Sequence, residues 1–452
     1  MCVKRRQEAQ NVGHLRCFNA ILLANPPHSL STHPGGISPG PLTRRKRLVG
    51  LDLGTCKVAV VIAEADDYGQ LIVTGVAETP AEGLRKGVVV NIDKTVQAIQ
   101  QAMITAERMA GVRGESVVVS LSGPHITSQN SRGVIAVSRP DREIGGDDVH
   151  RVVDAARAVS VPSDRQVIHV LPRTFTVDGQ EGVKDAVGMT GHRLEVETHI
   201  VTGAQTSVQN AIKCVHQAGL DVDDVVSQGL AAGEGVLNVN EVDLGVCLID
   251  IGAGTTDVVV YNEGSALHMA VLPIGGNHVT SDIAIGLRTT LTEAETLKLS
   301  YGHTLPEVIA AEERIDVRVV GGDRLQPTPR RYLAEIIGPR MREIFQLARE
   351  EVKRTGYDGL LPAGVVVTGG GARLMGTHDA AQSVFDSAVR LGLPTGVGGL
   401  SDRVAGPSYA AAVGLVKWGA RVQPAQNGRS HQQPPALAGA YQKTVRWLRD
   451  FF

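Results

Sequence analysis

The sequence predicts an α/β fold of two similar halves, each with a mixed sheet flanked by helices. A strand that runs into a glycine-containing turn occurs at residues 47–55 and recurs at residues 245–256. In both copies a second and a third strand follow through short turns. The chain has 452 residues, more than the roughly 50–250 residues of one compact domain. The duplication therefore predicts two related units that face each other.

Composition narrows the class of protein before any motif is considered. Apolar residues make up 42% of the chain and charged residues 20%, which is ordinary for a soluble globular protein. The formal net charge of −2 gives no argument for nucleic-acid binding, and we expect no nucleic-acid partner. The five cysteines form no Cys-x-x-Cys pair, which favours a reducing cytosol over a disulfide or metal framework.

The first half begins after a leader, residues 1–47, which is rich in Pro, Gly, Ser and His and is predicted to be disordered. Apolar residues recur at helical spacing through residues 93–110, with Asp93 in a plausible N-cap position. Short apolar runs bounded by turn residues indicate strands. The predicted strands are 47–52, 58–62, 71–76, 117–121, 166–171 and 198–201, and further helices are predicted at 147–159 and 205–219.

The second half repeats the pattern. Strands are predicted at 246–252, 256–261 and 267–272, and helices at 292–301 and 330–354. A buried strand at 364–368 ends in the triplet Gly369-Gly370-Gly371 before an apparent helix. Residues 422–438 contain Pro, Gln and Gly and are predicted to be a flexible linker.

Two glycine turns have the character of phosphate loops. Glycine lets backbone N–H groups approach phosphate oxygens without an intervening side chain. Gly54-Thr55 follows Asp52 in the first turn, and Gly252-Ala253-Gly254-Thr255-Thr256 follows Asp250 in the second. The two carboxylates are placed to hold a hydrated Mg²⁺, and Lys57 is placed to reach the β- or γ-phosphate as a point charge. Neither turn matches a P-loop or a Rossmann fingerprint.

The third glycine turn extends the interpretation from phosphate to nucleotide. A hydrophobic strand feeds Gly369-Gly370-Gly371-Ala372, and such a turn can lie flat against an adenosine. Together, the three turns predict that ATP with Mg²⁺ binds between the halves.

These motifs resemble the actin, sugar kinase and Hsp70 superfamily, and within it the FtsA family of bacterial cell-division proteins. The resemblance covers residues 48–452 and is carried by residues 49–55, 86–91, 121–126, 129–130, 169–172, 182–189, 245–252 and 273–284. It implies an actin-like ATPase fold of two lobes and an FtsA-type inserted subdomain. The helix with Gly406 and residues 410–414 is similar to the second connecting motif, an inter-domain hinge.

The resemblance also implies a division of the chain. The expected parts are 48–123, the first lobe with the first phosphate loop; 124–203, the inserted subdomain; 204–244, a helix and linker between the lobes; 245–285, the second lobe with the second phosphate loop; 286–355, its upper subdomain; 356–403, the adenosine motif; 404–421, the return to the first lobe; 422–438, the linker; and 439–452, an amphipathic membrane-targeting helix.

The resemblance completes the candidate site. Glu295 and Lys298 are expected near the ribose of the adenosine. The full nucleotide-binding set is Asp52, Gly54, Thr55, Cys56, Lys57, Asp250, Gly252, Ala253, Gly254, Thr255, Thr256, Gly275, Asn277, Glu295, Lys298, Gly369, Gly370, Gly371 and Ala372, with Asp52 and Asp250 on Mg²⁺ through water.

One position departs from the family pattern. Ala253 stands where the family commonly has glycine, and alanine permits the turn only if its φ stays negative. No catalytic residue is assigned from the sequence, and we expect at most a weak ATPase.

The C-terminal segment has two chemical faces. Tyr441, Val445, Leu448 and Phe452 fall on one helical face, which Trp447 and Phe451 widen. Lys443, Arg446 and Arg449 occupy the other side, which suits an interfacial helix on anionic lipid. The alternative is docking on the protein's own body or on a partner. The Pro-containing linker argues against docking on the main core.

The expected function is a membrane tether. The resemblance implies an actin-like protein that polymerises at the cytoplasmic face of the inner membrane, binds FtsZ there and supports the septal ring. The inserted subdomain is expected to contact further copies of the chain and later division proteins. The alternatives are an actin-fold sugar or acetate kinase, a pilus-assembly ATP-binding protein and an Hsp70-like chaperone. The first two leave the amphipathic terminal segment unexplained, and the third would need a substrate-binding β-domain for which too few residues follow the nucleotide domain.

Overall fold

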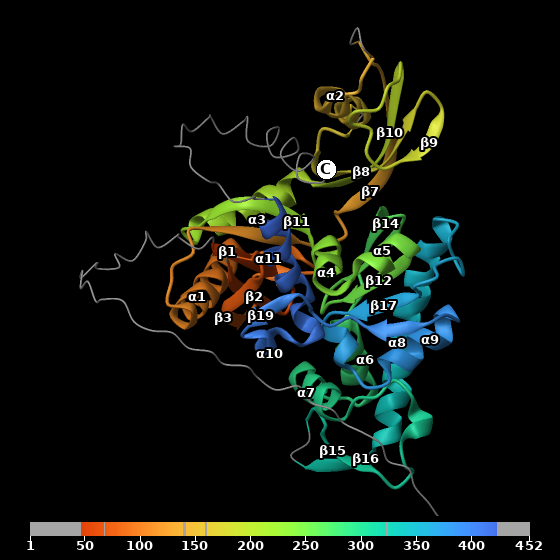
Figure 1. Ribbon diagram of the computed structural model, residues 1–452. Helices are drawn as coiled ribbons and strands as arrows, with labels where there is room; N and C mark the ends of the chain where they lie inside the picture. The colour runs from red at the N-terminus through yellow and green to blue at the C-terminus, as the bar shows by residue number, and fades with distance from the viewer. Residues whose placement is uncertain (1–46, 67, 139–141, 159–160, 322–323, 423–452) are drawn as a thin grey trace, which may run out of the picture. The chain divides into compact units, whose positions relative to one another are not determined.

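The computed structural model describes residues 47–66, 68–138, 142–158, 161–321 and 324–422, which belong to one unit of the chain (Figure 1). Nearly all of the predicted leader and both predicted C-terminal parts, the linker and the amphipathic helix, lie outside the described residues. The strands are β1 Arg47–Leu53, β2 Lys57–Ala65, β3 Leu71–Pro80, β4 Leu84–Arg85, β5 Val88–Val89, β6 Ser116–Leu121, β7 Thr127–Ala136, β8 Arg165–Val177, β9 Gln180–Val183, β10 Arg193–Ala204, β11 Asp221–Ser227, β12 Val246–Ile251, β13 Thr256–Asn262, β14 Ser265–Leu272, β15 Arg314–Arg318, β16 Leu325–Pro329, β17 Val365–Thr368, β18 Val389–Leu391 and β19 Val397–Gly399.

The helices lie between these strands in the chain. The α-helices are α1 Ile92–Ala110, α2 Gly146–Arg157, α3 Gln205–Gln217, α4 Gln228–Val236, α5 Val239–Leu244, α6 Gly276–Gly286, α7 Leu291–Tyr301, α8 Arg330–Arg354, α9 Thr377–Phe385, α10 Ser401–Val404 and α11 Ala410–Val422, and the short 3-10 helices are η1 Pro306–Val308, η2 Gly370–Arg373 and η3 Pro407–Tyr409.

Two sheets with the same internal order confirm the predicted duplication. The first lobe contains a six-stranded sheet of order β11-β6-β1-β2-β3-β19. The second lobe contains a five-stranded sheet of order β14-β13-β12-β17-β18. In each, the strand that leads into a glycine turn has one parallel neighbour, β6 or β17, and one antiparallel neighbour, β2 or β13. The fold is therefore α/β with two mixed sheets flanked by helices, as predicted.

The central strands are apolar because helices cover both faces of their sheets. All six residues of β12, Val246–Ile251, are buried, which explains a continuous apolar run in place of alternation. Helix α1 covers the first sheet with a stripe of buried residues that includes Ile99 and Met103, and its Ala106 packs in the same core. It ends at Gly111, which adopts the left-handed conformation with φ 68°.

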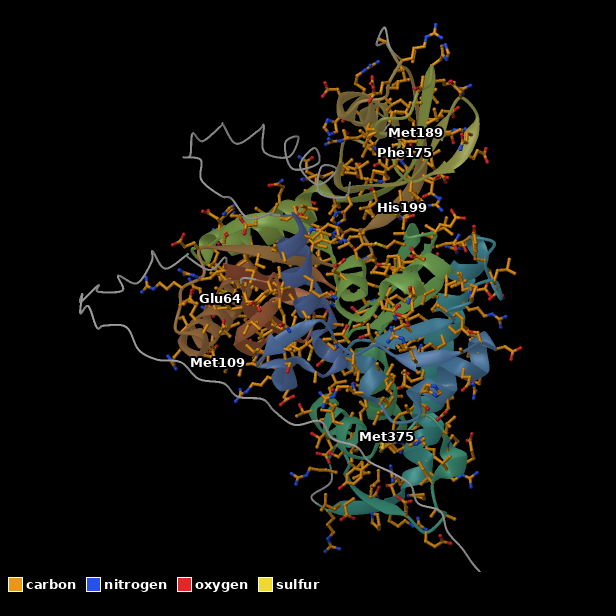
Figure 2. All side chains as sticks on the ribbon, in the orientation of Figure 1. Glu64, Met109, Phe175, Met189, His199 and Met375 are labelled. Atoms are coloured by element: carbon orange, nitrogen blue, oxygen red, sulfur yellow. The ribbon has the colours of Figure 1, made fainter. Side chains whose placement is uncertain are left out.

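The inserted subdomain forms its own sheet, of order β7-β10-β8-β9, against which α2 packs. Its core is separate from the cores of the two lobes and includes Ile144, Val152, Phe175 and Leu194. Phe175 lies close to Met189, which packs against this core (Figure 2).

Three local predictions were wrong. The N-cap of α1 is Asn91, whose side chain accepts a hydrogen bond from the Lys94 N–H, and not Asp93. The turn after β17 continues as the 3-10 helix η2, and α9 starts only at Thr377. The chain also returns to the first lobe earlier than residue 404, because β19 pairs in parallel with β3.

Other elements were not predicted at all. Strand β7 begins with six polar residues, 127–132, and its short apolar end, residues 134–136, is no run long enough to mark a strand. Strand β11 contains three aspartates, and α4 contains three glycines, so both contradict local propensity. Among the described residues, no helix is both long enough and apolar enough to cross a membrane.

Candidate nucleotide-binding site

The two predicted phosphate loops have the same backbone geometry. In the first, between β1 and β2, the Gly54 N–H donates to the Lys57 carbonyl at 3.0 Å. In the second, between β12 and β13, the Gly252 N–H donates to the Thr255 carbonyl at 2.9 Å. The sequence-level duplication therefore corresponds to one turn, used once in each lobe.

The loops contact each other across the lobes. A Cβ atom added to Gly254 would lie 2.7 Å from the Thr55 hydroxyl oxygen, so only glycine allows this approach. Thr55 in turn accepts a hydrogen bond from the Gly87 N–H at 2.9 Å. At the end of β6, the Ser122 hydroxyl lies 3.1 Å from the Thr255 hydroxyl. The structure thus brings the first and second loops together, as the sequence predicted.

Ala253 takes a backbone conformation open to any residue. It is absent from the described non-glycine residues with positive φ. The condition under which alanine is tolerated in this loop is therefore met.

Buried carboxylates gather beneath the loops. Asp52 accepts a hydrogen bond from Ser120 at 2.7 Å, and Asp250 accepts one from the Gln228 side-chain amide at 3.2 Å. A third buried carboxylate, Asp257 on β13, accepts a hydrogen bond from Ser122 at 2.9 Å, and its Oδ1 atom has no partner within the described part of the chain.

Burial makes negative charge costly at these three groups. It raises the pKa of Asp52, and it raises the pKa of Asp250 to about 7, to which the charge of Asp52 adds. Burial and the neighbouring Asp250 hold the pKa of Asp257 well above its ordinary value. Clustered carboxylates whose pKa values are strongly raised are typical of a functional site. Here they indicate a site that would be stabilised by a bound cation.

The predicted magnesium ligands fit a hydrated cation. Among the described residues, no three His, Cys, Asp or Glu side chains are close enough to hold a metal ion by themselves. Mg²⁺ usually retains several waters and takes only one or two carboxylates together with phosphate oxygens. Asp52 and Asp250, with the unpartnered oxygen of Asp257 beside them, match that mode.

The third glycine turn abuts the second loop. Gly369 has φ 85°, and an added Cβ there would overlap the Asp250 carboxylate. At Gly371, an added Cβ would overlap the Ile251 side chain. Because β17 pairs with β12 in parallel, Thr368 lies opposite Asp250, and the glycine turn that follows Thr368 lies beside the second loop.

The residues implied by the resemblance also gather there. The Gly276 and Asn277 N–H groups, at the start of α6 after Gly275, donate to the carbonyls of Gly252 and Ala253. Lys298 on α7 donates to the Gly276 carbonyl at 3.2 Å and pairs with Glu295 at 2.7 Å.

Lys57 has partners of its own. Its ammonium lies 2.7 Å from the Glu78 carboxylate and 4.1 Å from the centre of the Tyr409 ring. The hydrogen bond from Lys57 lowers the pKa of Glu78, and burial raises the pKa of Tyr409 to about 12. The role of Lys57 at phosphate stays a prediction. Cys56, its neighbour, is exposed and free.

Four residues at the site were missed from the sequence: Ser120, Ser122, Gln228 and Asp257. Three of them stand at or beyond the carboxyl ends of the parallel strands β6 and β11, where ligands commonly bind in α/β sheets. The fourth, Asp257, is a lone charge in an apolar strand. Polar residues at these strand ends were the available signal.

Two lobes of matching sheet order, with paired glycine turns at the same place in each, define the class. The fold is actin-like, with a subdomain inserted in the first lobe. A solved structure of the PilM-PilN type IV pilus biogenesis complex shares the fold at a TM-score of 0.61 and 19% sequence identity, over 84% of this chain and 100% of that one.

Sequence relatives place the chain within that class. The family model for the cell division protein FtsA matches residues 247–414, and the model for the SHS2 domain inserted in FtsA matches residues 123–202. The FtsA of Pseudomonas aeruginosa is 43% identical over 90% of this chain and 98% of its own length. The FtsA of Escherichia coli K12 is 37% identical over 91% of this chain and 99% of its own length. The chain belongs to the FtsA family of cell-division proteins.

Proposed function

We propose that this chain binds ATP with Mg²⁺ between its two phosphate loops and assembles on the cytoplasmic face of the cell membrane. There it tethers FtsZ filaments at the division septum. The observation that carries the nucleotide part is the contact between the loops at Thr55 and Gly254, directly above buried carboxylates.

The chemistry of the site supports a nucleotide with a divalent cation. In each glycine turn the first glycine N–H is used within the turn, and the N–H groups that follow it would donate hydrogen bonds to phosphate oxygens. Mg²⁺, when bound, supplies positive charge that offsets both the phosphates and the buried Asp52 and Asp250. The charged form of each carboxylate then becomes favourable despite its burial.

The adenosine would lie against the third glycine turn. Gly369 and Gly371 are held tightly against the second loop, while a Cβ added to Gly370 would meet nothing within 4 Å. Lys298 and Glu295 hold the start of α6 beside Ala253. The nucleotide would therefore touch the second lobe on two sides and the first lobe at Gly54 and Thr55.

Hydrolysis would be slow. Gln228 and Asp257 are the polar side chains best placed to orient a water near the terminal phosphate, because both lie beside Asp250. Each is also engaged in a hydrogen bond, Gln228 with Asp250 and Asp257 with Ser122. We therefore propose at most a weak ATPase that times assembly.

The remainder of the proposal rests on family membership and on the chain's own C-terminal sequence. Members of the FtsA family are cell-division proteins, which supports septal localisation for this chain. The amphipathic pattern of Tyr441–Phe452 supports attachment to anionic lipid. Each copy would bind weakly, and polymerisation would raise avidity without new contacts. The inserted subdomain would meet neighbouring copies and later division proteins.

Vesicle co-sedimentation tests the tether. The full chain is expected to pellet with anionic vesicles, whereas a chain that ends at residue 438 should stay in the supernatant. A full-length variant with Lys443, Arg446 and Arg449 changed to glutamine keeps the apolar face, so it should bind anionic vesicles less and lose its dependence on salt. FtsZ should join the pellet only with the full chain. Equal pelleting of the truncated chain would remove the tether role.

A further inference from the structure

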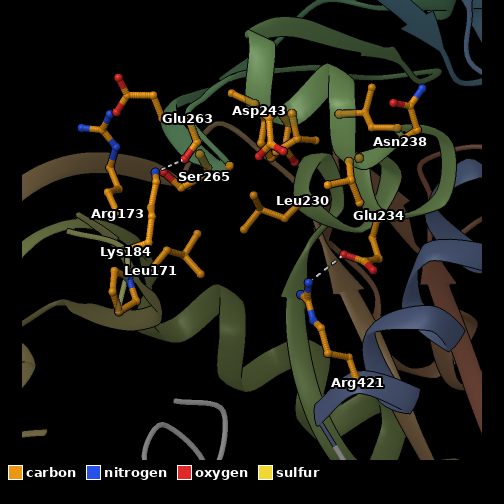
Figure 3. A pocket seen from close by; sticks show the side chains of 18 of the residues that line it. Leu171, Arg173, Lys184, Leu230, Glu234, Asn238, Asp243, Glu263, Ser265 and Arg421 are labelled. Carbon is orange, nitrogen blue, oxygen red and sulfur yellow. Dashed lines mark hydrogen bonds and ion pairs between the residues drawn. The ribbon is translucent and has the colours of Figure 1, made fainter. Parts of the chain in front are cut away.

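A cavity lies away from the phosphate loops. It encloses about 730 Å³, within the range of specific ligand sites. Its walls come from β8 and from Lys184, just after β9, in the inserted subdomain, from α4 and α5, from the β13–β14 hairpin and from the end of α11 (Figure 3). None of the predicted nucleotide-binding residues lines it.

The floor of this cavity is apolar. Leu171, Leu230 and Val242 line it from three different elements, and the Trp418 ring lines it from α11. Leu171 and Leu230 point into the space in Figure 3. The Tyr261 hydroxyl also belongs to the lining, and within the described residues it has no hydrogen-bond partner. Such a surface fits aromatic side chains with a few polar atoms.

The rim carries two free acidic groups. Glu234 is paired with Arg421 at 3.1 Å, and Lys184 donates to the backbone carbonyl of Glu263 (Figure 3). The side-chain carboxylates of Asp243 and Glu263 are exposed, and neither has an ion pair within the described part of the chain. Lys184 and Lys417 also line the cavity and donate to backbone carbonyls. It is therefore the carboxylates of Asp243 and Glu263, and not the rim as a whole, that can accept cations from an occupant.

The chain itself leads out of this cavity. Helix α11 ends at Val422, and its last turns place Lys417, Trp418 and Arg421 on the cavity wall. The predicted linker, residues 422–438, begins at that point, and residues 423–440 separate α11 from Tyr441. A coil of that length spans roughly 23 Å on average, so a segment at its end meets the cavity at an effective concentration of the order of millimolar.

We propose that the C-terminal segment, Tyr441–Phe452, docks in this cavity when no membrane is present. Its aromatic residues, with Trp447 foremost, lie on the apolar floor, and its cations face Asp243 and Glu263. A segment of a dozen residues forms a marginal helix in water and needs a surface to fold on. The linker, which separates this segment from the body, is also what lets it reach the cavity from the end of α11.

Docking in the cavity and insertion in lipid exclude each other. Both use the same aromatic face of Tyr441–Phe452, so the docked form cannot bind the membrane. The apparent affinity for vesicles is therefore the intrinsic affinity multiplied by the fraction of molecules in which the segment is free. This regulation rests on the proposed membrane function, whereas the docking itself does not.

Tryptophan fluorescence of the lipid-free full chain tests the docking directly. The chain has two tryptophans, Trp418 and Trp447, so the variant Trp418→Phe leaves Trp447 as the only reporter. We expect its emission to be blue-shifted and its quenching by acrylamide to be at least threefold weaker than in a free peptide of residues 439–452. The converse variant, Trp447→Phe, gives the signal of the cavity tryptophan alone.

Two changes in the cavity should release the segment. Val242→Glu places a charge on the apolar floor. The double change Asp243→Lys with Glu263→Lys alters only exposed rim residues, so we expect this double variant to keep the fold. In the Trp418→Phe background, both should shift Trp447 emission to the red and raise quenching. Leu325→Glu, an equally drastic change at an exposed residue of β16 outside the cavity, should leave both unchanged.

The outcomes separate this proposal from the membrane proposal. Trp447 that is quenched as in the free peptide, or that is indifferent to both cavity variants, would overturn the docking. Protection that disappears on dilution would assign the cavity to the segment of a second copy and would also overturn it. Added vesicles then report on the membrane role alone. If Trp447 is protected but the chain does not bind vesicles, the result supports the docking and removes the tether role. If the rim variant binds vesicles at least threefold more tightly than a matched control in which acidic residues are changed to glutamine, the result supports both the docking and the tether.

Discussion

At the residue scale, the site depends on where the methyl groups of the second loop lie. Gly254 faces Thr55 with no room for a Cβ, whereas its neighbour Ala253 already carries one at negative φ. The motif of acid, glycine and threonine was enough to predict both loops, because it is local in sequence. The partners Ser120, Ser122 and Gln228 come from β6, from the loop after it and from the start of α4. No local pattern linked them to the carboxylates of Asp52, Asp257 and Asp250.

Moving one methyl group by one residue tests this arrangement. Gly254→Ala should weaken ATP binding at least tenfold, because the added Cβ pushes the second loop off Thr55. The matched change Ala253→Gly removes a methyl group from the same loop and should leave the dissociation constant within about threefold. Isothermal titration with ATP and Mg²⁺ measures both. Equal affinities for the two variants would show that contact between the loops does not form the site.

At the scale of elements, the lobes are joined by two helices in unusually close contact. Helix α11 packs on β1, β2 and β6, and α4 packs on β12 and β13, so the pair connects the two sheets. They meet where Gly414 faces the backbone of Ala231 and where Gly235 faces the backbone of Ala410. The sequence suggested the α11 hinge through its resemblance, but the glycine-rich α4 gave no helical signal, because its stability comes from packing and not from propensity.

A single methyl group at this crossing should disturb both stability and communication between the lobes. A Cβ at position 414 would overlap the Ala231 carbonyl oxygen, so Gly414→Ala should lower the free energy of unfolding by about 1–3 kcal/mol. It should also reduce the rise in melting temperature that ATP produces. Gly406→Ala is the control, since its added Cβ meets only the Ser408 hydroxyl at 3.8 Å. A thermal melt of Gly414→Ala that matches the control, with and without ATP, would refute the role of this crossing.

At the scale of the whole molecule, the duplication explains why the fold was predictable and the cavity was not. Two strand–turn–strand units with equal chemistry specify two equivalent sheets, and β1 and β12 occupy the same place in them. The wall of the cavity beside α11 comes from four regions of sequence, with residues such as Leu171, Leu230 and Trp418. In a sequence, isolated apolar residues of this kind predict only burial in a hydrophobic core. Only the tertiary structure shows that they line one cavity.

Hydrogen exchange with and without ATP and Mg²⁺ tests the central claim most directly, that one nucleotide is held by both lobes. We predict slower amide exchange on ATP addition in both loops, at residues 54–57 and 252–256, and in the turn 369–372. The Gly254→Ala variant should lose that protection in both lobes together. Protection confined to one lobe, or exchange unchanged at saturating ATP, would contradict the account.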